Sequence, residues 1–137
     1  MQILIDGFDS RIAVQNYRKK FMGRYIFKLD EEHDEYIEWS TVTDSPASWP
    51  FSFDLAIECG YDPVRMNRAL ERGTSALWLN PPDGAWNDAT IMICDSEGQG
   101  YIRREDLRAY VYAVLADEER EVKTNSSHKF VTRFDDD

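Results

Sequence analysis

One segment of the chain has the residue types and spacing of a calcium-binding loop. Between residues 95 and 106, possible oxygen ligands stand at the first, third, fifth and twelfth positions, and Gly100 stands at the sixth, where an EF-hand loop turns sharply. Calcium prefers such hard oxygen ligands. The ligands that this hypothesis predicts are Asp95, Glu97, Gln99, Tyr101 and Asp106.

Other features of the same segment favour a simple turn. Glu97 and Gln99 are longer than the Asp or Asn usual at their positions, and Asp106 reaches less far than the usual twelfth-position Glu. The residues before the segment resemble a strand rather than an entering helix, and no second loop is evident to pair with it. A tight turn, allowed by the two glycines of the segment, is therefore the interpretation that we favour.

A second segment, residues 52–72, resembles the helix-turn-helix of bacterial DNA-binding regulators. Ala56, Gly60 and Met66 fall where that motif needs a small residue, a turn glycine and an apolar residue. The second helix of the motif would present its polar side chains to phosphates or base edges. Those side chains are Arg65, Asn67, Arg68 and Arg72.

Two observations count against DNA binding. The chain carries 26 Asp and Glu against 16 Lys and Arg, a formal net charge of -10, whereas DNA-binding domains usually have a basic face. The segment directly upstream is rich in aromatic residues and proline, with no further helix evident. The alternative is an αα-hairpin packed on a sheet. A flat, exposed stripe of arginines on residues 63–72 would favour the regulator.

The residues available for catalysis are few. His33 and His128 are the only histidines, and neither has a plausible nucleophile beside it in the sequence. Cys59 and Cys94 lie in apolar surroundings, where cysteine usually packs as a small hydrophobic residue. The sequence has no phosphate-binding loop and no dinucleotide fingerprint. We therefore expect a protein that is not an enzyme and uses no cofactor, and an enzyme remains the residual alternative.

The distribution of charge suggests how such a protein works. Residues 29–62 contain ten acidic residues and no Lys or Arg, whereas residues 1–28 have a net charge of +4. An acidic surface attracts basic partners, although it also simply keeps a protein soluble. Trp49 and Trp86 stand in loop-like segments and could serve as anchors for a partner. Our leading hypothesis is an interaction protein that binds a protein partner with a basic surface.

The hydrophobic pattern predicts an α+β fold. Residues 24–29 and 35–43 alternate as a β-hairpin, with Ile37, Trp39 and Thr41 on one face. We expect helices over 52–59, 62–73 and 105–122, a strand over 89–94, an edge strand over 128–134, and short strands over 2–5 and 77–79. The sequence thus predicts one α+β domain over residues 1–134, a small antiparallel sheet with a helical hairpin and a longer C-terminal helix, followed by a disordered acidic tail over 135–137.

Two short patches carry a family resemblance. Tyr-Ile-Glu-Trp-Ser-Thr-Val-Thr-Asp-Ser-Pro at residues 36–46, with Arg-Gly-Thr-Ser at residues 72–75, resembles small uncharacterised proteins encoded by bacteriophages of actinobacteria. Such proteins have no assigned chemistry, so the resemblance transfers no functional residue. It implies an accessory protein in the cytoplasm of an infected bacterial cell or in a virion. No apolar run is long enough to span a membrane, and nothing in the sequence indicates an oligomeric state.

Overall fold

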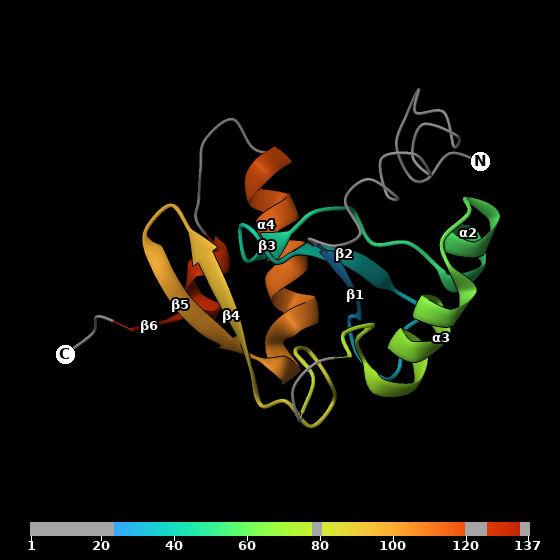
Figure 1. The fold of residues 1–137 in the computed structure, drawn as a ribbon. Helices are drawn as coiled ribbons and strands as arrows, with labels where there is room; N and C mark the ends of the chain where they lie inside the picture. The colour runs from blue at the N-terminus through green and yellow to red at the C-terminus, as the bar shows by residue number, and fades with distance from the viewer. Residues whose placement is uncertain (1–23, 78–80, 120–125, 135–137) are drawn as a thin grey trace.

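The fold of the chain is α+β, as the sequence predicts. The computed structural model describes residues 24–77, 81–119 and 126–134, and the predicted strand over 2–5, most of that over 77–79 and the tail over 135–137 lie outside them. Figure 1 shows the order of the elements. They are β1 (Arg24–Lys28), β2 (Tyr36–Ser40), β3 (Ser45–Pro46), α2 (Phe53–Glu58), α3 (Pro63–Arg72), β4 (Thr90–Asp95), β5 (Gly98–Arg103), the 3-10 helix η2 (Arg104–Asp106), α4 (Leu107–Glu119), the 3-10 helix η3 (Ser126–Phe130) and β6 (Thr132–Arg133).

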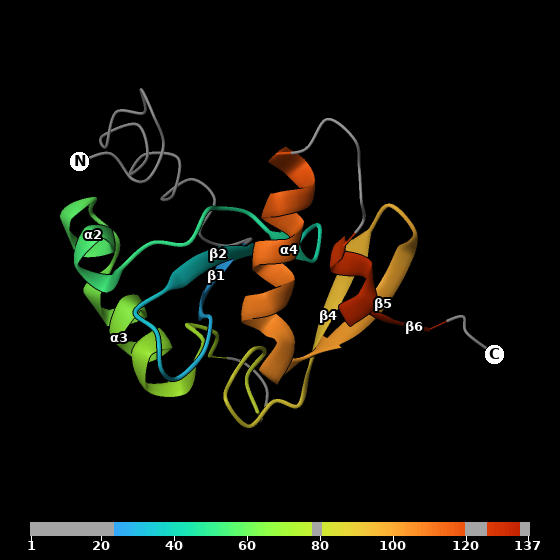
Figure 2. The same cartoon turned by 180° about the vertical axis from the view of Figure 1, so that it is seen from behind.

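The β1–β2 hairpin is the middle layer of the described fold. Its strands pair antiparallel, with Ile26 opposite Glu38 and Phe27 opposite Ile37. Ile26 belongs to a core shared with α2 and α3, whereas Phe27 and Ile37 belong to a second core shared with α4, β4 and β5. Figure 2 shows α4 lying across the hairpin from behind. The hairpin therefore has a core on each face.

The alternation of polar and apolar residues in the hairpin predicts strands with one buried and one solvent-facing side. The structure instead buries both sides of most of the hairpin, so that prediction was wrong. Glu38 is buried, although its strand position suggested a solvent-facing side chain. The hydroxyl of Tyr61 donates a hydrogen bond to Glu38 (2.6 Å), and Arg24 donates another to the same carboxylate (3.1 Å). A charged side chain can be buried when such partners replace water, so the polar face of the hairpin is a buried network.

The helical hairpin of α2 and α3 forms where the sequence predicts it. Ser52 caps α2 by accepting from the Leu55 amide (3.1 Å), and Asp62 caps α3 by accepting from the Val64 amide (2.9 Å). Gly73 ends α3 with φ at 91°, a left-handed conformation that glycine adopts without strain. These local signals explain why the boundaries of both helices were predicted closely.

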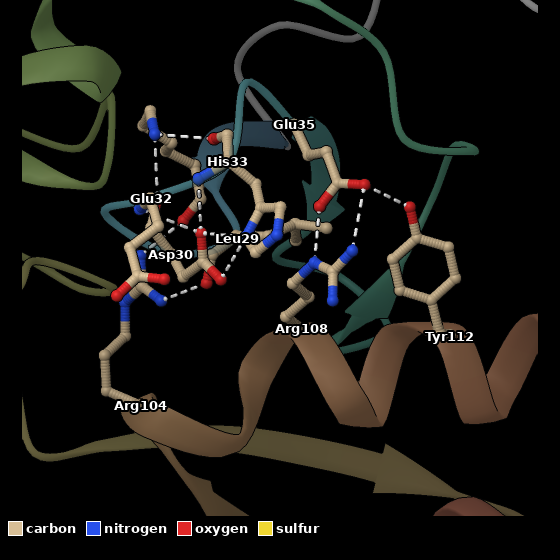
Figure 3. Close-up of polar contacts among 9 residues, drawn as sticks. Leu29, Asp30, Glu32, His33, Glu35, Arg104, Arg108 and Tyr112 are labelled. Carbon is tan, nitrogen blue, oxygen red and sulfur yellow. Dashed lines mark hydrogen bonds and ion pairs between the residues drawn. The ribbon is translucent and has the colours of Figure 1, made fainter.

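The β1–β2 turn and α4 are held together by side chains of one helical segment. Figure 3 shows Arg108 and Tyr112 of α4 reaching Glu35, and Arg104 reaching the backbone of Leu29. Burial alone would raise the pKa of Glu35, but hydrogen bonds from Arg108 and Tyr112, with the positive charge of Arg108, lower it below its ordinary value. The loop between the strands is thereby fixed despite having no glycine.

Two expectations for the C-terminal half were wrong. Residues 98–103 form the strand β5, which pairs with β4, so the described part of the chain has two three-stranded sheets rather than one. The predicted edge strand over 128–134 is reduced to the two residues of β6, because η3 occupies residues 128–130. The glycines of β5 made this strand hard to predict from the sequence. Gly100 packs so closely on Val131 and Thr132 that a side chain would not fit.

Candidate functional site

A pocket of about 410 Å³ lies between the β1–β2 hairpin and the strand β4. Its wall is formed by aromatic side chains of the hairpin, by the turn that follows β2, by the loop before β4 and by β4 itself. Phe27 and Trp39 stack on each other there, with ring centroids 5.3 Å apart. We call this site the acidic aromatic pocket and define it by its aromatic residues Tyr25, Phe27 and Trp39 and its carboxylates Asp44, Asp83 and Asp88.

The carboxylates of the pocket are held in an unfavourable electrostatic position. Asp83 is exposed, yet its partial burial raises its pKa above the ordinary value, and repulsion from Asp88 and Asp44 raises it further. Burial also raises the pKa of Asp44. The negative charge of Asp83 contributes, after burial, to the raised pKa of the Tyr25 hydroxyl. A cation in the pocket would relieve this repulsion, because it favours the ionised form of every one of these groups.

The backbone fixes the pocket through two unusual conformations. Asp44 is the only non-glycine residue in the described ranges with positive φ, at 52°, and its carbonyl accepts from the Cys94 amide of β4 (3.0 Å). Gly84 has φ at 82°, and its amide donates to Asp88 (2.9 Å). The Asp44 loop is therefore tied to β4, and the loop that carries Asp83 and Asp88 is held by a hydrogen bond within itself.

The arginines of the predicted DNA-binding helix do not form an exposed stripe. Arg65 donates to the carbonyl of Arg24 (2.8 Å), and Arg68 donates to the carbonyl of Ser75 (2.9 Å). Both are half-buried, whereas Asn67 and Arg72 are exposed. Arg65 thus ties α3 to β1, and Arg68 ties α3 to the segment that follows it, because backbone carbonyls there need donors. The helical pattern was confirmed, but the arrangement expected of a regulator was not.

The predicted calcium ligands are not gathered around one point. Asp95 and Gly98 pair across a tight turn, Gln99 and Tyr101 lie along β5, and Asp106 ends η2. A strand runs through the segment that would have to coil around the ion, so the structure favours the tight turn that we preferred over a calcium loop. In the ranges that the structure describes, no three His, Cys, Asp or Glu side chains are placed to hold a metal ion.

Asp95 instead joins the β4–β5 turn to the strand β6. Arg133 donates to both carboxylate oxygens of Asp95, at 2.7 Å each. His128 lies between two carboxylates, with Nδ1 at 2.9 Å from Glu97 and Nε2 at 3.5 Å from Asp95. Burial alone would raise the pKa of Asp95, but the hydrogen bonds from Arg133 and the Glu97 amide and the charges of Arg133 and His128 lower it.

This pair makes a prediction for the pH dependence of stability. The lowered pKa of Asp95 means that its contribution is complete above the unfolded-state value, about 4, and is lost as pH falls through the lower folded value. Arg133→Gln is expected to cost about 1–2 kcal/mol of unfolding free energy at pH 7. Urea unfolding of both proteins from pH 7 to pH 2.5 should show the difference shrinking below pH 4. A difference that persists undiminished at pH 2.5 would contradict the assignment.

The remaining residues that the sequence singled out are two tryptophans, a histidine and a cysteine. Trp49 is 42% exposed, as expected of an anchor. Trp86 is half-buried and therefore less available as an anchor than Trp49. Its ring packs against Arg104, with 4.6 Å between the guanidinium carbon and the ring centroid. His128 and Cys94 share a second pocket of about 210 Å³, yet both nitrogens of the imidazole face carboxylates. Both ring nitrogens therefore have carboxylate partners, and neither is left to act as a base toward the thiol.

The acidic aromatic pocket was missed by the sequence analysis. Its carboxylates are separated by up to 44 positions and occur among many other acids, so no spacing distinguishes them. The one signal available was the pair of turn-forming glycine and aspartate residues at 83–84.

No helix of the described residues has the length and apolar character needed to cross a bilayer. No family model, curated protein or solved structure matches the chain.

Proposed function

We propose that this protein is a non-enzymatic interaction protein that binds a basic protein partner. The observation that carries the proposal is the acidic aromatic pocket, in which three carboxylates stand beside aromatic rings. Aromatic faces and carboxylates both attract cations. A volume of about 410 Å³ is large enough to admit the side chain of an arginine or lysine.

The charge of the whole chain supports the same proposal. A net charge of -10 steers a basic partner toward the protein and speeds their encounter at low salt. Trp49, exposed on the chain between β3 and α2, is available as a further anchor. Because two patches resemble phage accessory proteins, we propose that the partner belongs to the infected bacterial cell or to the virion.

The experiment that tests this function separates binding from folding. Acetyl-arginine methylamide and acetyl-lysine methylamide, titrated into isotope-labelled protein, are expected to shift the NMR signals of Trp39, Gly84 and Met92. Acetyl-glutamate methylamide is the matched control and is expected to shift none of them. If neither cationic amide moves these signals at millimolar concentration and low salt, the proposed function is wrong.

The carboxylate variants give the corresponding prediction. The double variant Asp44→Asn, Asp83→Asn is expected to bind acetyl-arginine methylamide roughly tenfold more weakly, because each partly exposed ion pair contributes about 0.2–1 kcal/mol. Its melting temperature is expected to be unchanged or raised, because the raised pKa values mean that ionising these groups opposes folding above their folded-state pKa. Asp88 is left intact since it accepts from the Gly84 amide. Equal affinity of variant and parent would contradict the role of the carboxylates.

A further inference from the structure

The strand β4 lies at an edge of its sheet. Within the described residues the strand order is β4-β5-β6, and β4 with six residues is among the longest strands. An edge strand presents unpaired amides and carbonyls, which other chains can use. The outer edge of β1, by contrast, is covered: the Lys28 amide donates to Gly73, and the Ser75 amide donates to Ile26. Within the described residues, the outer edge of β1 is therefore covered, whereas β4 presents an edge of its sheet.

The register of β4 identifies the groups that point outward. The Arg104 amide donates to the Ala89 carbonyl (2.9 Å), so residue 89 and the odd-numbered residues after it bond to β5. The Cys94 amide points the other way, to the Asp44 carbonyl (3.0 Å). Because these directions alternate along a strand, the amide and the carbonyl of Met92 also point away from β5.

The outward-facing part of β4 adjoins the acidic aromatic pocket. Thr90 and Met92 both line that pocket, and Met92 is 47% exposed. The Asp44 loop closes the edge at Cys94, so the open part of β4 lies next to the carboxylates rather than at the far end of the strand. A strand added here would place alternate side chains beside Asp83 and Asp88.

We propose that β4 accepts an extended segment of the basic partner protein as an additional strand, with one arginine or lysine side chain of that segment entering the acidic aromatic pocket. This inference rests on the proposed function, since the charge of the pocket selects the side chain. Strand addition gives affinity through backbone hydrogen bonds, and a neighbouring pocket gives specificity. The pairing at Met92 and the pocket are thus two separable parts of one surface.

The test compares two probes on two variants. Met92→Pro removes the outward amide while leaving the bonds to β5, which an edge strand tolerates; Met92→Val keeps the amide and is the matched control. For the peptide acetyl-Thr-Val-Arg-Val-Thr-amide, measured by NMR titration, Met92→Pro is expected to bind about tenfold more weakly than Met92→Val. Acetyl-arginine methylamide is expected to bind both variants equally. Thermal unfolding checks that both variants are folded.

A second measurement needs no variant. The peptide is made in two versions. One carries a single N-methyl group on the backbone amide of a valine, and the other carries it on the backbone amide of the neighbouring arginine. The amides of neighbouring residues point to opposite edges of a strand. Strand addition predicts that one version loses about tenfold in affinity and the other does not. Equal losses, or no loss in either version, would overturn the inference, as would equal peptide affinity of the two Met92 variants when both fold. Failure of acetyl-arginine methylamide to bind the parent protein would instead overturn the proposed function and this inference with it.

Discussion

Replacing Arg104 with methionine is expected to lower the free energy of unfolding by about 3–5 kcal/mol. The guanidinium is buried and donates to the carbonyls of Gly84 (2.7 Å) and Leu29 (2.9 Å), with further bonds to Lys28 and Gly73. Burial lowers the pKa of Arg104 to about 10, so the group stays charged at neutral pH. Methionine fills similar space but donates no hydrogen bond. The Gly73 carbonyl keeps the Lys28 amide as a donor, and each buried carbonyl that is left unsatisfied costs about 1–3 kcal/mol.

Urea unfolding followed by tryptophan fluorescence measures this effect. Arg103→Met is the matched control, because the neighbouring side chain is 72% exposed and is expected to contribute no more than about 0.5 kcal/mol. Arg104→Lys keeps the charge but cannot reach all four carbonyls, so it is expected to fall between the parent protein and Arg104→Met. If Arg104→Met costs no more than Arg103→Met, Arg104 does not organise the fold.

Replacing Gly84 with alanine is expected to cost about 2–4 kcal/mol of unfolding free energy. The added methyl group would stand 2.4 Å from the nearest atom of the Phe27 ring, which is buried and stacked on Trp39 and cannot move aside easily. The positive φ of Gly84 adds the cost of a left-handed alanine, about 1 kcal/mol. Because Gly84 and Phe27 both line the acidic aromatic pocket, binding of acetyl-arginine methylamide is expected to weaken as well.

Gly98→Ala is the matched control for this substitution. Gly98 also has positive φ, at 115°, but no atom lies within 4 Å of the position that its methyl group would take. It therefore carries the conformational cost without the collision. Thermal and urea unfolding of the two variants should differ by about 1–3 kcal/mol. Equal stability would show that the contact of Gly84 with Phe27 leaves room for a side chain.

The parts of the fold that the sequence predicted well are those encoded by neighbouring residues. Asp62 and Gly73 mark the ends of α3, and each acts on backbone groups within a few positions of itself. The β1–β2 hairpin follows from alternating residues on two adjacent segments. Such signals require no knowledge of the rest of the chain.

The two alternatives that we disfavoured, the calcium loop and the DNA-binding stripe, rest on local patterns that distant contacts override. Asp95 has the residue type of a first calcium ligand, but Arg133, 38 positions away, takes both of its oxygens. Arg65 and Arg68 have the spacing of a basic stripe, but Arg65 donates to the carbonyl of Arg24 in β1 and Arg68 to that of Ser75 after α3. In both cases the partner of the side chain lies outside the segment that carries the pattern.

The sequence by itself determined the α+β class, the helical hairpin with its caps, the β1–β2 hairpin and the strongly acidic charge, because each depends on composition or on contacts between near neighbours. Only the tertiary structure decided that Asp44, Asp83 and Asp88 meet beside aromatic rings and that the outer edge of β4 faces them. Those placements depend on how the two sheets pack around α4, and packing joins residues whose separation along the chain carries no signal.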